Sequence, residues 1–544
     1  MPSLPQSPPA IGPLIASLFV VGAAAGFAAT AGSASDPLHL RIDALINGYI
    51  EGAAVADRST DAEFLRRAHL DFAGDLPTAE SVRTFLADTD PDKRTVLVDR
   101  LLADPGYSTH MADQFAVFLM ERCGDDPHWR LWLESSFAEN KPWDQMVREI
   151  VRADHRDEPN RGAAFFYSKR LESYGQIPTD YAGLTRDVGR LFLGIDLQCA
   201  ECHNHRTVAT YQQADFQGLF AAYQNIKLYQ ADFPAIEEGV MEGPLEFASV
   251  FNQRKKTTAP RIPGLEEVAV ETFGVEDAHL VAPDKKAKIP GIPRFSPLSH
   301  FAVQMPESPT FASNIVNRLW FHMIGRGIVE PLDLFHPENP PSHPELLDLL
   351  STAFVESGFD IRSFLREISL TEVYQRSGQF PDGLPAAHDH DFGVARERRL
   401  SAEQLFRMVL TATGNSEEHL AEATGSEDGE TSLRDKFLDA FTGQPKEPEL
   451  EFTASLKGTL LLLNDNDFSR VFAPAAENLA GQLAARPEDA AVAEKLYLHV
   501  FSRFPTDEER EDILALLGAQ PARQDAVADL IWAMVSSTEF ATNH

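Results

Sequence analysis

Cysteine is scarce in this sequence. The 544 residues include only three cysteines, and so small and odd a number excludes a scaffold built on disulfides. Cys123 stands alone, whereas Cys199 and Cys202 are separated by only two residues. Exported proteins usually use their cysteines for disulfides that join distant segments. A pair this close in sequence instead indicates a local task for the two thiols.

Positive charge is also in short supply. The chain has 48 Lys and Arg residues against 82 Asp and Glu residues, which gives a formal net charge of −34 at pH 7. An acidic surface of this size repels phosphate backbones and anionic lipids, so we expect neither nucleic acid nor an anionic membrane surface as a partner. The sequence also lacks the G-x-S-x-G, Walker, dinucleotide-binding and H-E-x-x-H motifs, so those enzyme classes have no support.

Long apolar runs are absent from the chain except near its beginning. Ile11–Ala29 is apolar, and small residues that suit cleavage follow it up to Ala34. This pattern predicts a signal peptide over residues 1–34 and an exported protein, periplasmic or secreted. However, no Lys or Arg precedes the run, since Arg41 is the first. An uncleaved membrane anchor is therefore the alternative, and we expect no other membrane contact.

Strand patterns are few, and helix signals are many. Three capping-box patterns precede apolar residues spaced near 3.6, and they begin at Ser342, Ser401 and Thr506. A further pair of helices is predicted at Thr78–Ala87 and Asp92–Leu102. Apolar and polar residues alternate, weakly, only at Val268–Phe273 and His279–Ala282, which we therefore predict to be short strands. The sequence therefore predicts a mainly α protein.

The middle of the chain differs in character from its two flanks. Residues 233–306 are rich in proline and have little helical periodicity. We interpret this segment as a long irregular connector with a few short strands. It separates a predicted N-terminal helical domain, residues 35–232, from a predicted C-terminal helical domain, residues 307–544.

The close cysteine pair belongs to a C-x-x-C-H motif. Cys199, Cys202 and His203 follow in this order, and His205 comes two residues later. Thiols at positions i and i+3 lie on one side of a helical turn, where they can add to the two vinyl groups of one haem. The following histidine then faces the iron. The spacing therefore predicts a covalently attached haem c, with these three residues binding the cofactor.

Two alternatives to haem are open. Zinc or another transition metal could be bound by the two thiolates together with His203 and His205, although ligands so close in sequence are cramped for a tetrahedral site. Alternatively, Cys199 and Cys202 could form a small disulfide clip in a protein without catalytic activity. These readings predict a metal-dependent enzyme and a scaffold protein, respectively.

The haem hypothesis leaves the second axial ligand of the iron unassigned. His205 lies too close in sequence to reach the opposite face of the same iron, and no suitable residue is evident nearby. The best distant candidates are His322 and His343 in the C-terminal half. We therefore expect the two halves to pack together so that one of these histidines completes the site.

Several motifs resemble a known family. Asp61–Gly74 resembles the opening of secreted planctomycete and verrucomicrobial proteins that carry a cytochrome-associated domain of unknown function. Leu193–His205 is similar to the family's central motif, C-A-x-C-H-D-H, with Asn204 in place of the usual Asp. Asn314–Pro331 resembles the V-N-R-x-W…G-R-G signature of a second domain that follows the first in this family.

The resemblance implies an exported protein that is often encoded beside polysaccharide-degrading systems. Together with the C-x-x-C-H motif, it leads to the hypothesis of an exported redox protein that carries haem c. Its partner would be an electron-transfer protein or a carbohydrate substrate. A haem- or metal-dependent oxidoreductase activity on carbohydrate, including sulfated polysaccharide, is the enzymatic form of this hypothesis.

Overall fold

The computed structural model describes residues 36–50, 52, 54–173, 175–284, 286, 291–379, 391–417, 432–447 and 456–544. The predicted signal peptide lies outside these ranges. The described part is mainly helical, with only short two-stranded sheets, which confirms the predicted fold class. Within the described ranges, every helix is too short or too polar to span a bilayer.

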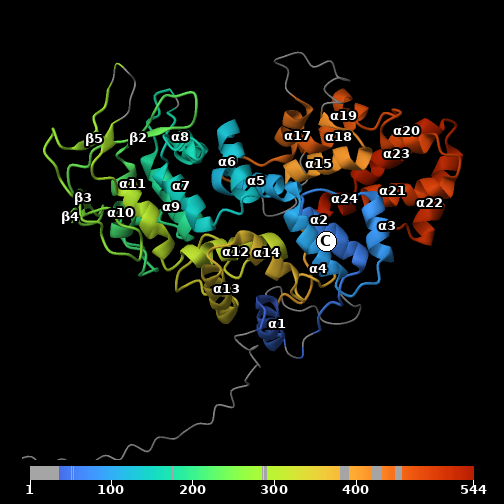
Figure 1. Cartoon of the computed structure of the whole chain (residues 1–544), viewed down its shortest axis with the longest axis horizontal. Helices are drawn as coiled ribbons and strands as arrows, with labels where there is room; N and C mark the ends of the chain where they lie inside the picture. The colour runs from blue at the N-terminus through green and yellow to red at the C-terminus, as the bar shows by residue number, and fades with distance from the viewer. Residues whose placement is uncertain are drawn as a thin grey trace, which may run out of the picture.

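In the described residues up to Tyr223, the named elements are all helices (Figure 1). Its elements are α1 (Leu38–Tyr49), α2 (Asp61–Phe72), α3 (Ala79–Ala87), α4 (Lys93–Ala103), α5 (Pro105–Met120), α6 (Pro127–Ala138), α7 (Trp143–Arg152), η1 (Arg161–Ala164), α8 (Phe165–Arg170), α9 (Tyr181–Leu193), η2 (Cys199–Glu201) and α10 (Gln213–Tyr223). The predicted pair of helices at 78–102 corresponds to α3 and α4.

The strands of the middle segment form three antiparallel hairpin-like pairs. These are β1 (Ile226–Leu228) with β2 (Ile236–Glu238), β3 (Leu245–Ala248) with β4 (Lys255–Thr258), and β5 (His279–Val281) with β6 (Ile292–Pro293). In the β3–β4 pair, Leu245 lies opposite Thr258 and Ala248 opposite Lys255. The predicted strand at His279–Ala282 is therefore present, whereas Val268–Phe273 forms no strand.

The described residues after β6 are again mainly helical. Its elements are α11 (Pro297–Gln304), η3 (Met305–Glu307), α12 (Phe311–Ile324), α13 (Pro344–Glu356), α14 (Ile361–Ser369), β7 (Arg398–Arg399), α15 (Ala402–Thr413), α17 (Leu433–Phe441), α18 (Leu456–Asn464), α19 (Asn466–Arg470), α20 (Leu479–Ala484), α21 (Asp489–Val500), α22 (Asp507–Ala519), α23 (Arg523–Val535), α24 (Thr538–Ala541) and β8 (Thr542–Asn543). Strand β8 pairs with β7 near the C-terminus.

Two of the three predicted capping boxes are present as complete reciprocal pairs. Thr506 with Glu509 caps α22, and Ser401 with Gln404 caps α15. The third prediction, at Ser342, is wrong by one residue because His343 is the N-cap and Pro344 is the first residue of α13. The Ser342 hydroxyl instead donates to the backbone oxygen of Ile328, so it ties α13 to the preceding loop.

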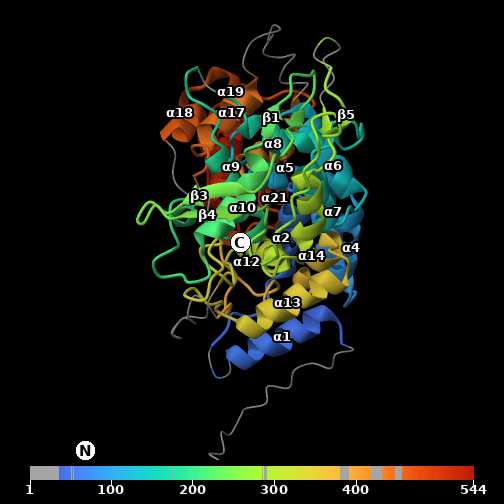
Figure 2. The same cartoon turned by 90° about the vertical axis from the view of Figure 1, so that its left-hand side faces the viewer.

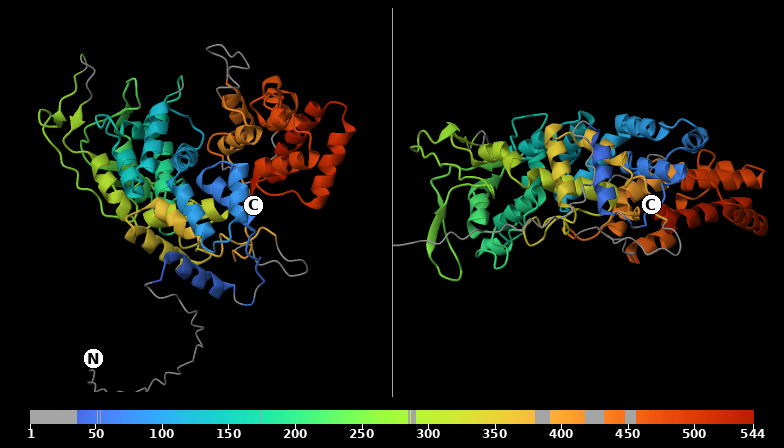
Figure 3. Two further views of the ribbon diagram at one scale, coloured as in Figure 1. Left: turned by 45° about the vertical axis from the view of Figure 1, so that its right-hand side comes forward. Right: turned by 90° about the horizontal axis from the view of Figure 1, so that it is seen from below.

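The buried side chains form two hydrophobic cores, but these two cores do not coincide with the two predicted domains. One core consists mainly of residues between Ile42 and Tyr374, from helices that include α1, α5, α9, α12 and α14, and it also takes in Phe392 and Leu498. The other runs from Leu400 to Phe540 and also takes in Leu70 and Leu76 from the N-terminal part. Figure 1 and the left view of Figure 3 show these as two lobes, with α2 to α4 between them. The predicted boundary at residue 307 thus falls inside a continuous core.

The predicted halves pack closely together. Helix α12 contacts α9, α14 contacts α4, and α13 contacts α1; Figure 2 shows α1 and α13 side by side. At the junction of the two lobes, the buried Arg66 of α2 donates to the backbone oxygens of Val500 and Phe540 at 3.2 and 3.0 Å. The C-terminal segment is therefore anchored on a helix from the beginning of the chain.

Candidate haem-attachment site

The C-x-x-C-H motif lies on one helical turn directly after α9. Gly194 ends α9 with a φ of 65°, in the left-handed conformation that glycine adopts readily. The backbone N–H of Glu201 then donates to the oxygen of Leu197 at 3.2 Å, and that of His203 to the oxygen of Cys199 at 3.4 Å. Leu197 and Ala200 are buried, which fixes the inner side of this turn on the core.

The outer side of the turn carries both thiols. Cys199 and Cys202 are exposed, and neither is in a disulfide. Because they are three residues apart on one turn, their side chains leave the surface on the same side. This arrangement suits two thioether bonds to one flat ligand that lies over the turn.

The His203 side chain is oriented by a backbone contact. Its Nδ1 atom lies 2.7 Å from the backbone oxygen of Asn204. A carbonyl oxygen only accepts, so Nδ1 carries the hydrogen in the neutral ring and Nε2 presents a lone pair. Iron- and zinc-binding histidines are commonly held in this tautomer by such a donor bond. His203 therefore suits the role of an axial ligand.

Asn204, which departs from the family pattern, has a structural task. Its side-chain oxygen accepts the backbone N–H of Gln213 at 2.9 Å, at the beginning of α10. The contact closes the loop between the motif and α10. A carboxylate can accept the same bond, so the replacement of Asp by Asn retains this function of the side chain.

His205 is engaged in a different way. Its Nδ1 atom accepts the backbone N–H groups of Val208 at 3.0 Å and Thr207 at 3.3 Å. The hydrogen of the neutral ring is therefore on Nε2, and no lone pair is left for a metal. In the described ranges, no three His, Cys, Asp or Glu side chains gather so that they could hold a metal ion.

The tip of the β3–β4 hairpin covers one flank of the motif. The backbone N–H of Val250 donates to the oxygen of Cys202 at 3.2 Å, and the Phe251 ring lies 4.8 Å from the His203 ring, centroid to centroid. Val250 and Phe251 are nevertheless 59% and 63% exposed. The exposed valine and phenylalanine beside Cys202 and His203 form an apolar surface against which a haem could lie.

Comparison with known proteins identifies two family domains in this order. Residues 41–228 match the family described as "PSCyt2: Protein of unknown function (DUF1549)", and residues 300–433 match "PSD1: Protein of unknown function (DUF1553)". The chain belongs to this two-domain family of unknown function. No curated protein and no solved structure matches the chain.

The C-x-x-C-H motif lies within the PSCyt2 domain, and the second signature, on α12, lies within the PSD1 domain. The β hairpin that covers the motif belongs to neither matched range. The PSD1 range extends across both hydrophobic cores, because it includes α12 as well as α15. The two family domains are thus fused into one packed body.

The two PSD1-domain histidines predicted to complete the site lie in other environments. His322 of α12 has its ring 6.0 Å from that of His110 of α5. The buried His343 packs against Tyr49 at 4.4 Å and against Phe392 at 5.1 Å. These contacts give no support to either residue as an axial ligand, because they place the rings at the α5–α12 and α1–α13 junctions.

The PSD1-domain histidine that does approach the motif region is His336, which sequence reasoning missed. Its ring lies 5.5 Å from that of Tyr211, and the Tyr211 ring lies 6.0 Å from that of His205. Burial and the nearby His205 lower the pKa of His336. His336 lies in a proline-rich loop, where the sequence has no helical periodicity that could have predicted which residues it contacts.

A pocket of about 500 Å³ lies beside His336. Its wall takes Leu197 and Tyr211 from the PSCyt2 domain, Pro263 from the middle segment, and Phe335 and His336 from the PSD1 domain. Leu197 also begins the turn that bears the thiols. The pocket therefore adjoins the inner side of the motif, and all three segments of the chain contribute to it.

Proposed function

We propose that this protein is a redox protein that carries a covalent haem c at Cys199 and Cys202, with His203 as an axial ligand of the iron. One observation carries the proposal: a single helical turn bears two free, exposed thiols and a histidine whose Nδ1 is bound to a backbone oxygen. Haem attachment requires only these three side chains. The alternative metal cluster also requires His205, whose Nδ1 is already engaged by backbone N–H groups.

Each side chain has a defined task in this proposal. Each thiol would hold the haem by adding its S–H bond across one vinyl double bond, with the sulfur on one carbon and the hydrogen on the other, so no oxidant would be needed. His203 offers the Nε2 lone pair, and the Asn204 carbonyl holds the ring in that tautomer. When bound, the haem supplies one-electron transfer between two iron oxidation states. Val250 and Phe251, which contact Cys202 and His203, would lie beside it.

The exposure of the motif supports electron exchange with a partner protein. Both cysteines lie at the surface, so an attached haem would have an edge accessible to another electron carrier. The second part of the proposal is that the protein is exported and acts on a carbohydrate substrate. The pocket beside His336 is the candidate binding site for that substrate. Figure 1 shows α9 and α10, the helices on either side of the motif, on the lobe opposite α20 to α23.

The test uses the full-length chain, exported from a host with active cytochrome c maturation. The wild-type protein should show a Soret band and a covalent mass increase of one haem. Cys199→Ser and Cys202→Ser should each leave one thioether bond, and the double variant should lose covalent haem. His203→Ala should keep the mass increase but shift the spectrum, because only an axial bond to the iron is lost.

His205→Ala is the matched control. It removes a histidine two residues from His203 but leaves both thiols and the proposed ligand, so the mass and spectrum should stay as in the wild type. In a metal cluster, His203→Ala and His205→Ala would instead lower the metal content alike. Colourless, haem-free wild-type protein from the maturation-competent host would contradict the proposal.

A further inference from the structure

The β3–β4 hairpin projects from the surface beside α10, as Figure 2 shows. Its base is anchored, because Phe247 is buried and the Gln213 side chain of α10 donates to the backbone oxygen of Ala248 at 3.2 Å. Residues 250–257, by contrast, are all exposed. The Val250 N–H bond to the motif holds this tip beside the turn that bears the thiols.

The hairpin carries a run of basic side chains. Arg254, Lys255 and Lys256 follow one another from the tip into β4, and all three are exposed. Lys255 pairs with Glu246 of β3 at 2.7 Å, so its charge is compensated. Arg254 and Lys256 form no ion pair in the part of the chain that the structure describes. The start of β4 therefore carries two positive charges without an anionic partner.

Arg206 adds a third positive charge from the side of the motif. It is exposed, and it makes no ion pair among the described residues. Its guanidinium carbon lies 5.7 Å from the centroid of the Phe251 ring, within the range of a cation–π contact. Because Phe251 also lies against His203, the motif and the basic tip form one continuous surface.

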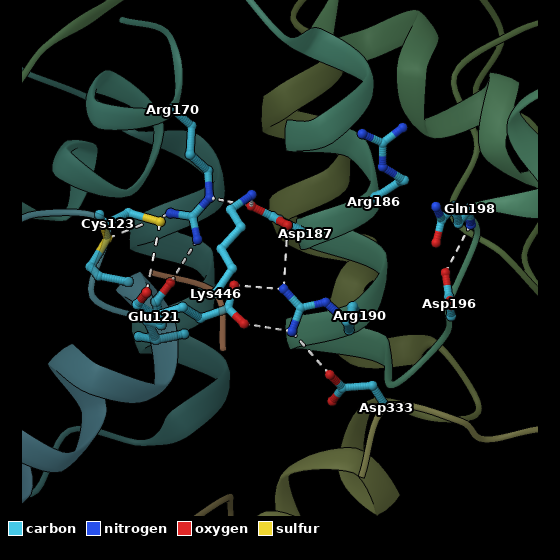
Figure 4. A network of polar contacts seen from close by, with 12 residues as sticks. Glu121, Cys123, Arg170, Arg186, Asp187, Arg190, Asp196, Gln198, Asp333 and Lys446 are labelled. Atoms are coloured by element: carbon cyan, nitrogen blue, oxygen red, sulfur yellow. Dashed lines mark hydrogen bonds and ion pairs between the residues drawn. The ribbon is translucent and has the colours of Figure 1, made fainter. Parts of the chain in front are cut away.

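The acidic residues next to the motif are already engaged. Glu201 pairs with Arg186 of α9, and the half-buried Asp196 accepts the Gln198 N–H at 2.8 Å, as Figure 4 shows. The charge at the tip is therefore positive, although the whole chain carries −34. Charges farther than about 8–10 Å away are largely screened at physiological ionic strength, so the local charge decides what the tip attracts.

The centre of this basic surface is apolar. Val250 and Phe251 are 59% and 63% exposed, and the three uncompensated basic residues come from both sides of them. Protein–protein interfaces commonly combine an apolar and aromatic centre with a charged rim. An anionic polysaccharide would match the basic side chains but would leave the apolar pair without a matching group. The combination therefore favours a protein with an acidic surface.

From these observations, we infer that an acidic protein with exposed apolar side chains docks on this hairpin-tip surface, which consists of Arg206, Val250, Phe251, Arg254 and Lys256. Its apolar side chains would cover the centre, and its carboxylates would pair with the three basic residues. The inference rests on the proposed function only where it calls this partner an electron carrier, because docking here would bring the partner beside an attached haem.

The test measures the binding of an acidic polypeptide to the full-length exported protein by titration calorimetry. The probe is the soluble copolymer poly(Glu,Tyr), which combines carboxylates with aromatic side chains. It should bind the wild type, and its affinity should fall at least about tenfold when the ionic strength rises from about 0.05 M to about 0.5 M. Polyglutamate, which lacks the aromatic side chains, should bind more weakly.

Two variants with the same change in net charge locate the binding. Arg254→Glu combined with Lys256→Glu should weaken poly(Glu,Tyr) binding at least about tenfold, because like charges then face each other. Arg396→Glu combined with Arg486→Glu is the matched control. Both arginines are exposed, lie outside the hairpin-tip surface and form no ion pair within the described ranges, so binding should stay close to that of the wild type. Phe251→Ser should weaken binding about fivefold, because an aromatic anchor is lost.

The Cys199→Ser/Cys202→Ser variant separates this inference from the proposed function. It cannot hold haem covalently, but it keeps the hairpin-tip surface and should still bind poly(Glu,Tyr). Haem-free wild type that binds the copolymer would therefore contradict haem attachment and support docking. Absence of binding to the wild type, equal losses in the two charge-reversal variants, or tighter binding of dextran sulfate, an anionic polysaccharide without aromatic groups, would overturn the inference.

Discussion

Asn314 of α12 donates a hydrogen bond from Nδ2 to the backbone oxygen of Leu191 in α9, over 2.7 Å, and both residues are buried. The bond joins the signature helix of the PSD1 domain to the helix that leads into the C-x-x-C-H turn. The position of the turn relative to the second domain therefore depends on this one side chain as well as on apolar packing.

Asn314→Ala should lower the free energy of unfolding by about 1–3 kcal/mol, because the buried oxygen of Leu191 would lose its donor. Urea unfolding, followed by circular dichroism, measures the change. Gln444→Ala removes an amide from an exposed position and should leave the unfolding midpoint almost unchanged. Equal stability of Asn314→Ala and the wild type would show that the bond does not hold the domains together.

Gly194, at the end of α9, combines a left-handed backbone with close neighbours. A Cβ atom there would lie 2.6 Å from Cδ2 of Phe335 and 2.9 Å from Oδ1 of Asn314. Gly194→Ala should therefore destabilise the protein by about 2–4 kcal/mol, since steric overlap adds to the cost of the left-handed conformation. Thermal unfolding of the purified variant measures this effect.

Gly358 separates the two contributions to that cost. Its φ is +72°, close to the +65° of Gly194, but no atom lies within 4 Å of its Cβ position. Gly358→Ala should cost only about 1 kcal/mol, the part due to the backbone. If both variants lost the same stability, the close approach of Phe335 and Asn314 to Gly194 would have no energetic importance.

Glu238 should make the stability depend on pH. It ends β2, where its carboxyl group accepts from the Ser296 hydroxyl at 2.6 Å and from the Leu298 N–H at 3.1 Å. Burial raises its pKa from 4.5 to about 7, although these two bonds oppose the shift. The folded protein thus holds this proton more tightly than the unfolded chain does. The stabilisation is fully present below pH 4.5 and is lost as the pH rises to about 7.

The pH effect can be isolated with Glu238→Gln, which cannot ionise. The stability of the wild type relative to this variant should fall by about 3 kcal/mol between pH 4.5 and pH 7. Urea unfolding at several pH values gives this difference, in which the titration of other groups cancels. Glu242→Gln, at an exposed position nearby, should follow the wild type throughout. A constant difference between wild type and Glu238→Gln would refute the prediction.

Local signals in the sequence predicted the helices well. Ser401 and Thr506 cap their helices because the hydroxyl accepts the backbone N–H three residues later, and the side chain of that later residue accepts the backbone N–H of the cap, whatever surrounds them. The same reasoning misplaced the start of α13 at Ser342, because the hydroxyl of Ser342 bonds to Ile328 of another segment instead. It also predicted a strand at Val268–Phe273, where alternation alone was insufficient because a strand requires a partner.

The sequence by itself determined the helical class, the order of the two family domains and the three side chains of the candidate haem site, because each of these depends on residues close together in the chain. Only the tertiary structure decided which histidines belong together. It brought His336 towards the motif through Tyr211 and placed His322 beside His110. These pairings depend on how α5, α9 and α12 pack, and such long-range packing follows from the shapes of many buried side chains rather than from any short motif.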